Sequence, residues 1–193
     1  DENETYTYLG KALRVLREHS ANFSNFDWKP LIPSNKDKIW INYWPGNQKD
    51  IYTVYCSDPN GNSGALFKPV KSGNHYVDVF NHTEINRIND TLRIDLTSFD
   101  TKYLGTNNEG SIAVIAGFDT LLSITLDGDE LSTAASKGTK IKIWAGDPSY
   151  SKTSIELSTK KHTTDLTESF KDYEGEYIIQ LFESAELIDE RIV

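Results

Sequence analysis

The residues with the clearest chemical potential lie in one predicted strand near residue 40. Residues 38–44 read Lys-Ile-Trp-Ile-Asn-Tyr-Trp, and alternate side chains of an extended strand share one face. Trp40, Asn42 and Trp44 therefore lie together, with the two indole rings roughly 13 Å apart along the strand. Indole rings stack on apolar sugar faces, and an amide between them hydrogen-bonds hydroxyl groups, so the pattern predicts a carbohydrate-binding surface.

The same pattern has a structural alternative. If both faces of this strand are buried, the two tryptophans lie beneath a covering helix and form part of the core. Trp28 and Trp144 could belong to either arrangement.

A second candidate site is a run of oxygen-bearing side chains at Asp58, Asn60 and Asn62, a spacing that occurs in calcium-binding loops. The helix–loop–helix calcium motif also needs glycine at its sixth position and an acid at its twelfth, where this chain has Ser63 and Pro69. A hairpin turn centred on Asn60 and the following glycine is therefore the preferred interpretation. A calcium site is the alternative.

The segment Asp127-Gly128-Asp129-Glu130 repeats this choice between an acidic turn and a weak cation site made by Asp127 and Asp129. No other cofactor is expected. The four histidines lack the spacing of metal-binding pairs, and Cys56, the single cysteine, is expected to be a buried apolar thiol.

No nucleophile elbow, phosphate-binding loop or dinucleotide fingerprint occurs in the chain. The sequence therefore leans away from an enzyme. Glycoside cleavage needs only two carboxyl groups, however, and 29 Asp and Glu residues are present. A polysaccharide-directed hydrolase thus stays an open alternative.

Composition narrows the class of partner. A net charge of −9 opposes binding to nucleic acid, which requires clustered cations. The sequence has no apolar stretch of about 18 residues, so membrane insertion is not expected. The chain lacks methionine and begins at Asp1, which favours a processed protein that is extracellular or at a cell surface.

The elements that must position these residues begin with a helix over residues 1–20. Tyr6, Leu9, Leu13 and Leu16 form one apolar stripe at spacings of three and four residues. This stripe is expected to pack on the rest of the protein. A helix that binds a partner or a second copy is the alternative.

Short strands separated by turn residues follow the helix. The sequence predicts them at 38–44, 51–57, 65–70, 75–80, 91–99, 111–117, 121–126, 139–145, 153–158, 176–183 and 186–193. Residues 111–117 are apolar on both faces, as in a central strand, and the last two strands should form a hairpin. Residues 158–169 are expected to be a long loop or a short helix.

Turn signals every 8–12 residues between short strands are typical of a sandwich or barrel. The predicted fold is one domain over residues 1–193, mainly β, with an antiparallel β-sandwich of jelly-roll type over 38–193. The N-terminal α-helix packs across one face, and a barrel is the alternative.

Together these features favour a non-catalytic binding module of a secreted or surface protein, with a glycan ahead of a protein as its ligand. The first alternative is a structural subunit of a capsid, fibre or adhesin. The sequence leaves the oligomeric state open.

Overall fold

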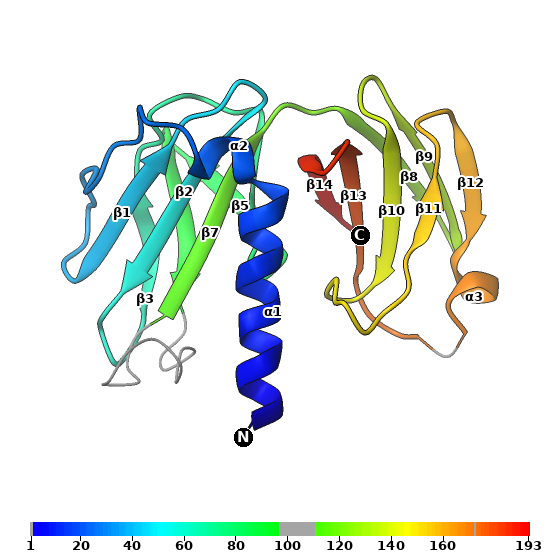
Figure 1. Ribbon diagram of the computed structural model, residues 1–193, viewed down its shortest axis with the longest axis horizontal. Coiled ribbons are helices and arrows are strands. Elements are labelled where there is room, and N and C mark those ends of the chain that lie inside the picture. Colours follow the sequence, from blue (N-terminus) through cyan, green and yellow to red (C-terminus); the bar gives the residue numbers. More distant parts are fainter. Residues whose placement is uncertain (1, 97–110, 172) are drawn as a thin grey trace. The chain divides into compact units, whose positions relative to one another are not determined.

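The computed structural model describes residues 2–96, 111–171 and 173–193, and it divides the chain into two compact units, Asp1–Phe118 and Asp119–Val193. We call these unit 1 and unit 2 (Figure 1). The predicted class, mainly β with antiparallel sheets and an N-terminal helix, is confirmed. Each unit is described by itself below.

Unit 1 contains one sheet of seven strands in the order β1-β2-β7-β4-β5-β6-β3, and every neighbouring pair is antiparallel. The strands are β1 (Ile39–Trp44), β2 (Lys49–Cys56), β3 (Asn62–Phe67), β4 (His75–Asp78), β5 (Thr83–Ile88), β6 (Thr91–Leu96) and β7 (Ser111–Phe118).

This sheet curls on itself, so that its two ends face each other across a shared core. Ile41 of β1 and Tyr52 of β2 belong to the same buried cluster as Phe67 of β3 and Leu92 of β6. Strands far apart in the order can share one core only if the sheet bends back over itself, which is the arrangement of a sandwich. The curl leaves the opposite face of β1 and β2 outside this core.

The central position predicted for residues 111–117 is confirmed. β7 lies between β2 and β4, and seven of its eight residues are buried. A strand covered on both faces needs apolar side chains at odd and even positions alike, which explains why its sequence does not alternate.

The predicted helix is present as α1 (Glu2–Glu18), followed by the short α2 (Ser20–Phe23). In the parts of the chain that the structure describes, no helix has the length and apolar character needed to cross a membrane.

The prediction that the apolar stripe of α1 packs on the rest of the protein is wrong. The stripe of Tyr6, Leu9, Leu13 and Leu16 is 39–70% exposed, whereas Val15 is buried. Three contacts fix the opposite face instead: Tyr8 meets Phe80 edge to face, Arg14 bonds His82, and Lys49 Nζ donates to Glu18 O. Helical periodicity in the sequence identifies only the most apolar face of a helix, so it does not predict such long-range contacts.

Unit 2 is a small sandwich of two antiparallel sheets, with strand orders β11-β10-β13-β14 and β12-β9-β8. Its elements are β8 (Leu122–Asp127), β9 (Glu130–Ala135), β10 (Lys140–Ala145), β11 (Ile155–Leu157), β12 (His162–Asp165), α3 (Leu166–Ser169), β13 (Tyr177–Glu183) and β14 (Glu186–Ile192). Leu131, Ile141, Ile179 and Ile188 form its core between the two sheets.

The predicted C-terminal hairpin is confirmed by the pairing of β13 with β14. β5, β9 and β12 were not predicted, and 158–169 holds β12 as well as a short helix. The strand expected over 91–99 is present over the described residues Thr91–Leu96 as β6, and 97–99 lie outside the described residues. The sandwich expected over 38–193 is divided between two compact units, each with its own core. That the chain forms one domain stays a prediction.

Candidate functional site

The predicted tryptophan strand is β1, and its tryptophan side chains lie on the outer face of the unit 1 sheet. Trp40 of β1 is opposite Tyr55 of β2, and their rings stack with centroids 5.7 Å apart at 28°. Trp40 is 43% exposed. The alternative in which a helix covers both tryptophans is therefore wrong for Trp40.

Trp44 lies lower in the surface because a third tryptophan covers it. Trp28 stacks on Trp44 at 4.8 Å and 12°, and Phe23 meets the same ring edge to face at 5.3 Å. The Trp44 indole N–H donates to Thr53 Oγ1 at 3.0 Å. Trp28 is 41% exposed, so at this end of the strand the ring accessible to a ligand is that of Trp28.

Trp28 reaches this position because the chain around it runs antiparallel beside β1. Lys29 and Tyr43 exchange two backbone hydrogen bonds of 2.8 Å, and Ile32 N donates to Ile41 O at 2.9 Å. Pro30 has no backbone N–H and interrupts any strand pattern in the sequence. Only the structure therefore shows that Trp28 joins the site.

Asn42 lies between the two stacks with its amide oriented. Its Oδ1 accepts a hydrogen bond from Leu31 N at 3.1 Å, so its Nδ2 group points away as a donor. We define the aromatic strip as Trp28, Trp40, Trp44 and Tyr55 together with Asn42. Phe26 and Leu31 are also exposed on the segment beside β1.

The structure explains the first cation candidate as a turn. Asp58 accepts a hydrogen bond from Asn60 N at 3.0 Å and pairs with Lys38 Nζ at 3.3 Å; these contacts lower the pKa of Asp58. The expected hairpin is wrong, because β2 and β3 pair with other strands and not with each other. Asn62 begins β3.

The second cation candidate is the tight turn between β8 and β9, as one of its interpretations predicted. Asp127 pairs with Glu130, Gly128 has a φ of +58°, and Asp129 O accepts from Leu166 N at 2.9 Å. Across the described ranges, no three His, Cys, Asp or Glu side chains gather as a metal site would require. Calcium binding at either turn stays a prediction.

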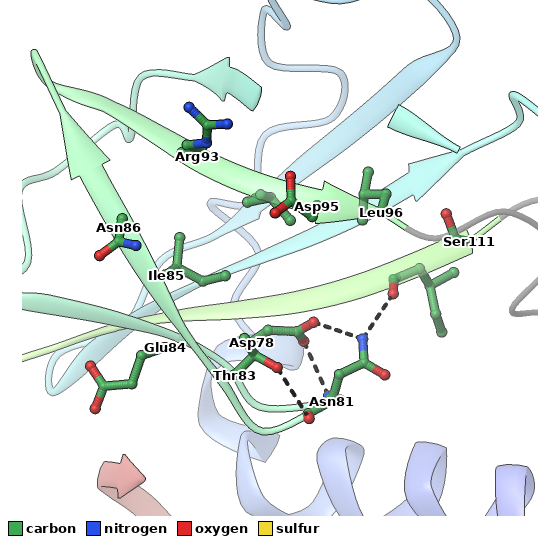
Figure 2. A pocket seen from close by; sticks show the side chains of 12 residues that line it. Asp78, Asn81, Thr83, Glu84, Ile85, Asn86, Arg93, Asp95, Leu96 and Ser111 are labelled. Carbon is green, nitrogen blue, oxygen red and sulfur yellow. Dashed lines mark hydrogen bonds between the residues drawn. The ribbon is translucent and has the colours of Figure 1, made fainter. Parts of the chain in front are cut away.

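A cavity of about 430 Å³ in unit 1 has no counterpart in the sequence predictions. Asp78 lines this cavity and accepts hydrogen bonds from Val114 N (3.0 Å) and Phe80 N (3.1 Å). It also accepts one from the Asn81 side-chain amide (2.7 Å; Figure 2). Burial raises the pKa of Asp78, while these hydrogen bonds oppose the rise. Both oxygens are occupied, so this carboxyl mainly ties β4 to β7.

A buried cationic cluster lies where α1 and α2 meet the sheet. His19 is fully buried, and neither ring nitrogen has a hydrogen-bond partner among the described residues. Desolvation, with the charges of Lys49, Arg14 and His82, holds the pKa of His19 well below its ordinary value. The Cys56 thiol is buried in the core, as expected.

Comparison with known proteins assigns no family. No protein-family model matches the chain, and comparison with the curated proteins found no match. Among solved structures, the gamma-CGTase from alkalophilic Bacillus clarkii aligns with a TM-score of 0.34 and 12% identity. The alignment covers 94% of this chain and 28% of that enzyme's chain, and at this TM-score it identifies neither a fold nor an activity.

Proposed function

We propose that the chain is a carbohydrate-binding module of an extracellular or cell-surface protein, and that the aromatic strip is its binding surface. The observation that supports this proposal best is the exposed Trp40–Tyr55 stack, next to the oriented amide of Asn42. Tyr55 supports the indole of Trp40 by stacking on it. A rigid aromatic ring loses little conformational entropy when a ligand stacks on it.

The geometry suits an extended chain of sugar units. Trp40 and Trp28 present rings near the two ends of β1, and the backbone spacing separates these ends by roughly 13 Å. The Asn42 Nδ2 group between them can donate to hydroxyl oxygens. Apolar faces with a few placed polar groups are typical of small-molecule sites.

Replacement Trp40→Ala is expected to weaken binding of a neutral oligosaccharide at least tenfold, which corresponds to about 1.4 kcal/mol. The melting temperature should change little, because the indole lies outside the core on the outer face of β1. A glycan array would select the oligosaccharide, and quenching or shift of tryptophan fluorescence would give its affinity.

Tyr150→Ala is the matched control, because Tyr150 is an exposed aromatic residue of unit 2. Its affinity should equal that of the unchanged chain. A blank array with unchanged fluorescence would overturn the proposal, and a large fall in melting temperature for Trp40→Ala would identify this residue as structural.

A second candidate function, assembly through α1, is favoured by the exposed stripe. Tyr6, Leu9, Leu13 and Leu16 repeat at the a and d spacing of a heptad, which is the seam of a helix pair. A broad apolar face packs on a globular core, whereas this narrow seam suits another helix. The proposed occupant is α1 of a second copy.

The double replacement Leu9→Glu and Leu13→Glu is expected to convert a concentration-dependent dimer into a monomer, because it places charges in the seam. Light scattering after size-exclusion chromatography measures this change. Thr7→Glu, on an exposed part of the same helix, should leave the dimer intact. A monomer at all concentrations before any replacement would reject assembly through α1.

A further inference from the structure

We propose that the cavity between β5, β6 and β7 of unit 1 is a second carbohydrate site, which takes a single neutral pyranose residue. It is separate from the aromatic strip, and it rests on the proposed function only for the choice of carbohydrate as the ligand class.

The cavity exists because β5 changes its partner. Residues 83–85 pair with β4, whereas 86–88 pair with β6. In the described structure, residues 94–96 of β6 then pair only with β3 on their other side. The sheet splits at this point and leaves the cavity. The cavity volume of about 430 Å³ falls within the range of about 300–1,000 Å³ for small-molecule sites.

The split is lined by side chains that have hydrogen-bonding capacity left for a ligand. Asn86 lies opposite Arg93 across the β5–β6 pair, and Asp95 follows on the same face of β6 (Figure 2). All three are exposed, and none has a side-chain hydrogen bond or ion pair to another described residue. Amide and guanidinium groups donate to hydroxyl oxygens, and the carboxylate accepts from hydroxyl protons.

Ser111 supplies an independent sign of a ligand. It lines the cavity and is only 1% exposed, yet its Oγ has no hydrogen-bond partner among the described residues. A buried hydroxyl without a partner loses free energy relative to water. A hydroxyl-bearing ligand would supply the missing bond. Asn81 contributes similarly, since its Nδ2 is engaged with Asp78 and Ile112 O while its Oδ1 remains an acceptor.

Charge and apolar lining narrow the ligand class. Two exposed carboxyl groups, those of Glu84 and Asp95, oppose one guanidinium, that of Arg93, so an anionic sugar would be repelled. The remaining walls are aliphatic and suit the C–H faces of a pyranose; they come from Ile85, Ile94, Leu96 and Ile112. A neutral sugar satisfies both conditions.

The test is a titration of the ¹⁵N-labelled full chain with methyl glycosides of glucose, galactose, mannose and N-acetylglucosamine, followed by amide chemical shifts. At least one glycoside should move the amides of 84–86, 93–96 and 111–112, with a dissociation constant on the order of 1–10 mM. Methyl glucuronide should bind at least tenfold more weakly. Equal binding of the glucuronide, or no movement of these amides up to about 100 mM of any glycoside, would overturn the proposal.

Variants separate this site from the aromatic strip. Asn86→Ala and Asp95→Asn should each weaken the response at least tenfold, whereas Asn74→Ala, an exposed asparagine outside the cavity, should leave it unchanged. Trp40→Ala should also leave the amide response at the cavity unchanged. The proposal for the cavity can therefore be rejected while the aromatic strip still binds oligosaccharide, and the proposal for the strip can be rejected while the cavity still binds a glycoside. A response that survives Asn86→Ala and Asp95→Asn would place the sugar elsewhere.

Discussion

The replacement Asp78→Ala is expected to lower the free energy of unfolding of unit 1 by about 3 kcal/mol. It would be the most damaging single change at the cavity. The carboxyl group accepts hydrogen bonds from the backbone N–H groups of Val114 and Phe80 and from the Asn81 side chain. Each buried donor left without an acceptor costs about 1–3 kcal/mol.

The loss should be smaller for Asp78→Asn, about 1 kcal/mol, because asparagine keeps the shape and one acceptor oxygen. Burial raises the pKa of Asp78, which means that the charge itself is disfavoured and its removal is tolerated. The asparagine amide would, however, face the donating Nδ2 of Asn81.

Urea denaturation at neutral pH measures both changes. Asp95→Asn is the matched control, because Asp95 is an exposed residue of the same cavity and should change stability by less than about 0.5 kcal/mol. If Asp78→Ala were as stable as the unchanged chain, the hydrogen bonds that tie β4 to β7 would contribute nothing to the fold.

The second large effect is a loss of stability as the pH falls below about 6.5, caused by His19. This residue is fully buried without hydrogen-bond partners among the described residues, and desolvation holds its pKa well below the ordinary value. The unfolded chain therefore binds a proton on His19 at a pH where the folded chain does not. Each pH unit below about 6.5 costs up to about 1.4 kcal/mol until the folded pKa is reached.

Three cations face His19 and oppose its protonation: Arg14 of α1, Lys49 of β2, and His82 in the turn before β5 when it is charged. His19→Leu removes both the titration and the two unpaired ring nitrogens. The variant should be at least as stable as the original chain at pH 7, and its stability should fall less between pH 7 and pH 5.

The measurement is the difference in unfolding free energy between the two chains at several pH values, which cancels the titration of the other groups. His162→Gln is the control, because His162 is only partly buried and bonds Ser158; it should keep the pH profile of the original chain. Parallel profiles for His19→Leu and the original chain would show that His19 does not cause the loss.

The sequence determined the local structure wherever a segment's own pattern decides it. Alternation over 38–44 and the double-sided apolar run at 111–117 gave the correct strands, because side-chain period alone fixes which residues share a face. The strands of 83–88 and 162–165 were not predicted because most of their residues are polar and none is buried. Their backbone pairing, and not side-chain burial, holds them in the sheets.

In the candidate site, too, the local sequence pattern predicted some residues, and contacts between distant segments brought in another. Trp40 and Asn42 were predicted because strand alternation places them on one face. The sequence left open whether Trp28 belongs to the strip or to the core, because it joins the strip through backbone bonds from Lys29 to Tyr43 that no local pattern encodes.

Only the tertiary structure decided which face of α1 is buried and where the sheet splits. The helix turns its most apolar stripe outward because Tyr8 and Arg14 find their partners, Phe80 and His82, in the turn between β4 and β5, far away in the chain. The cavity forms because β5 exchanges one partner strand for another halfway along its length. Both outcomes depend on contacts between distant segments, whereas the sequence by itself determines the periodicity of each segment.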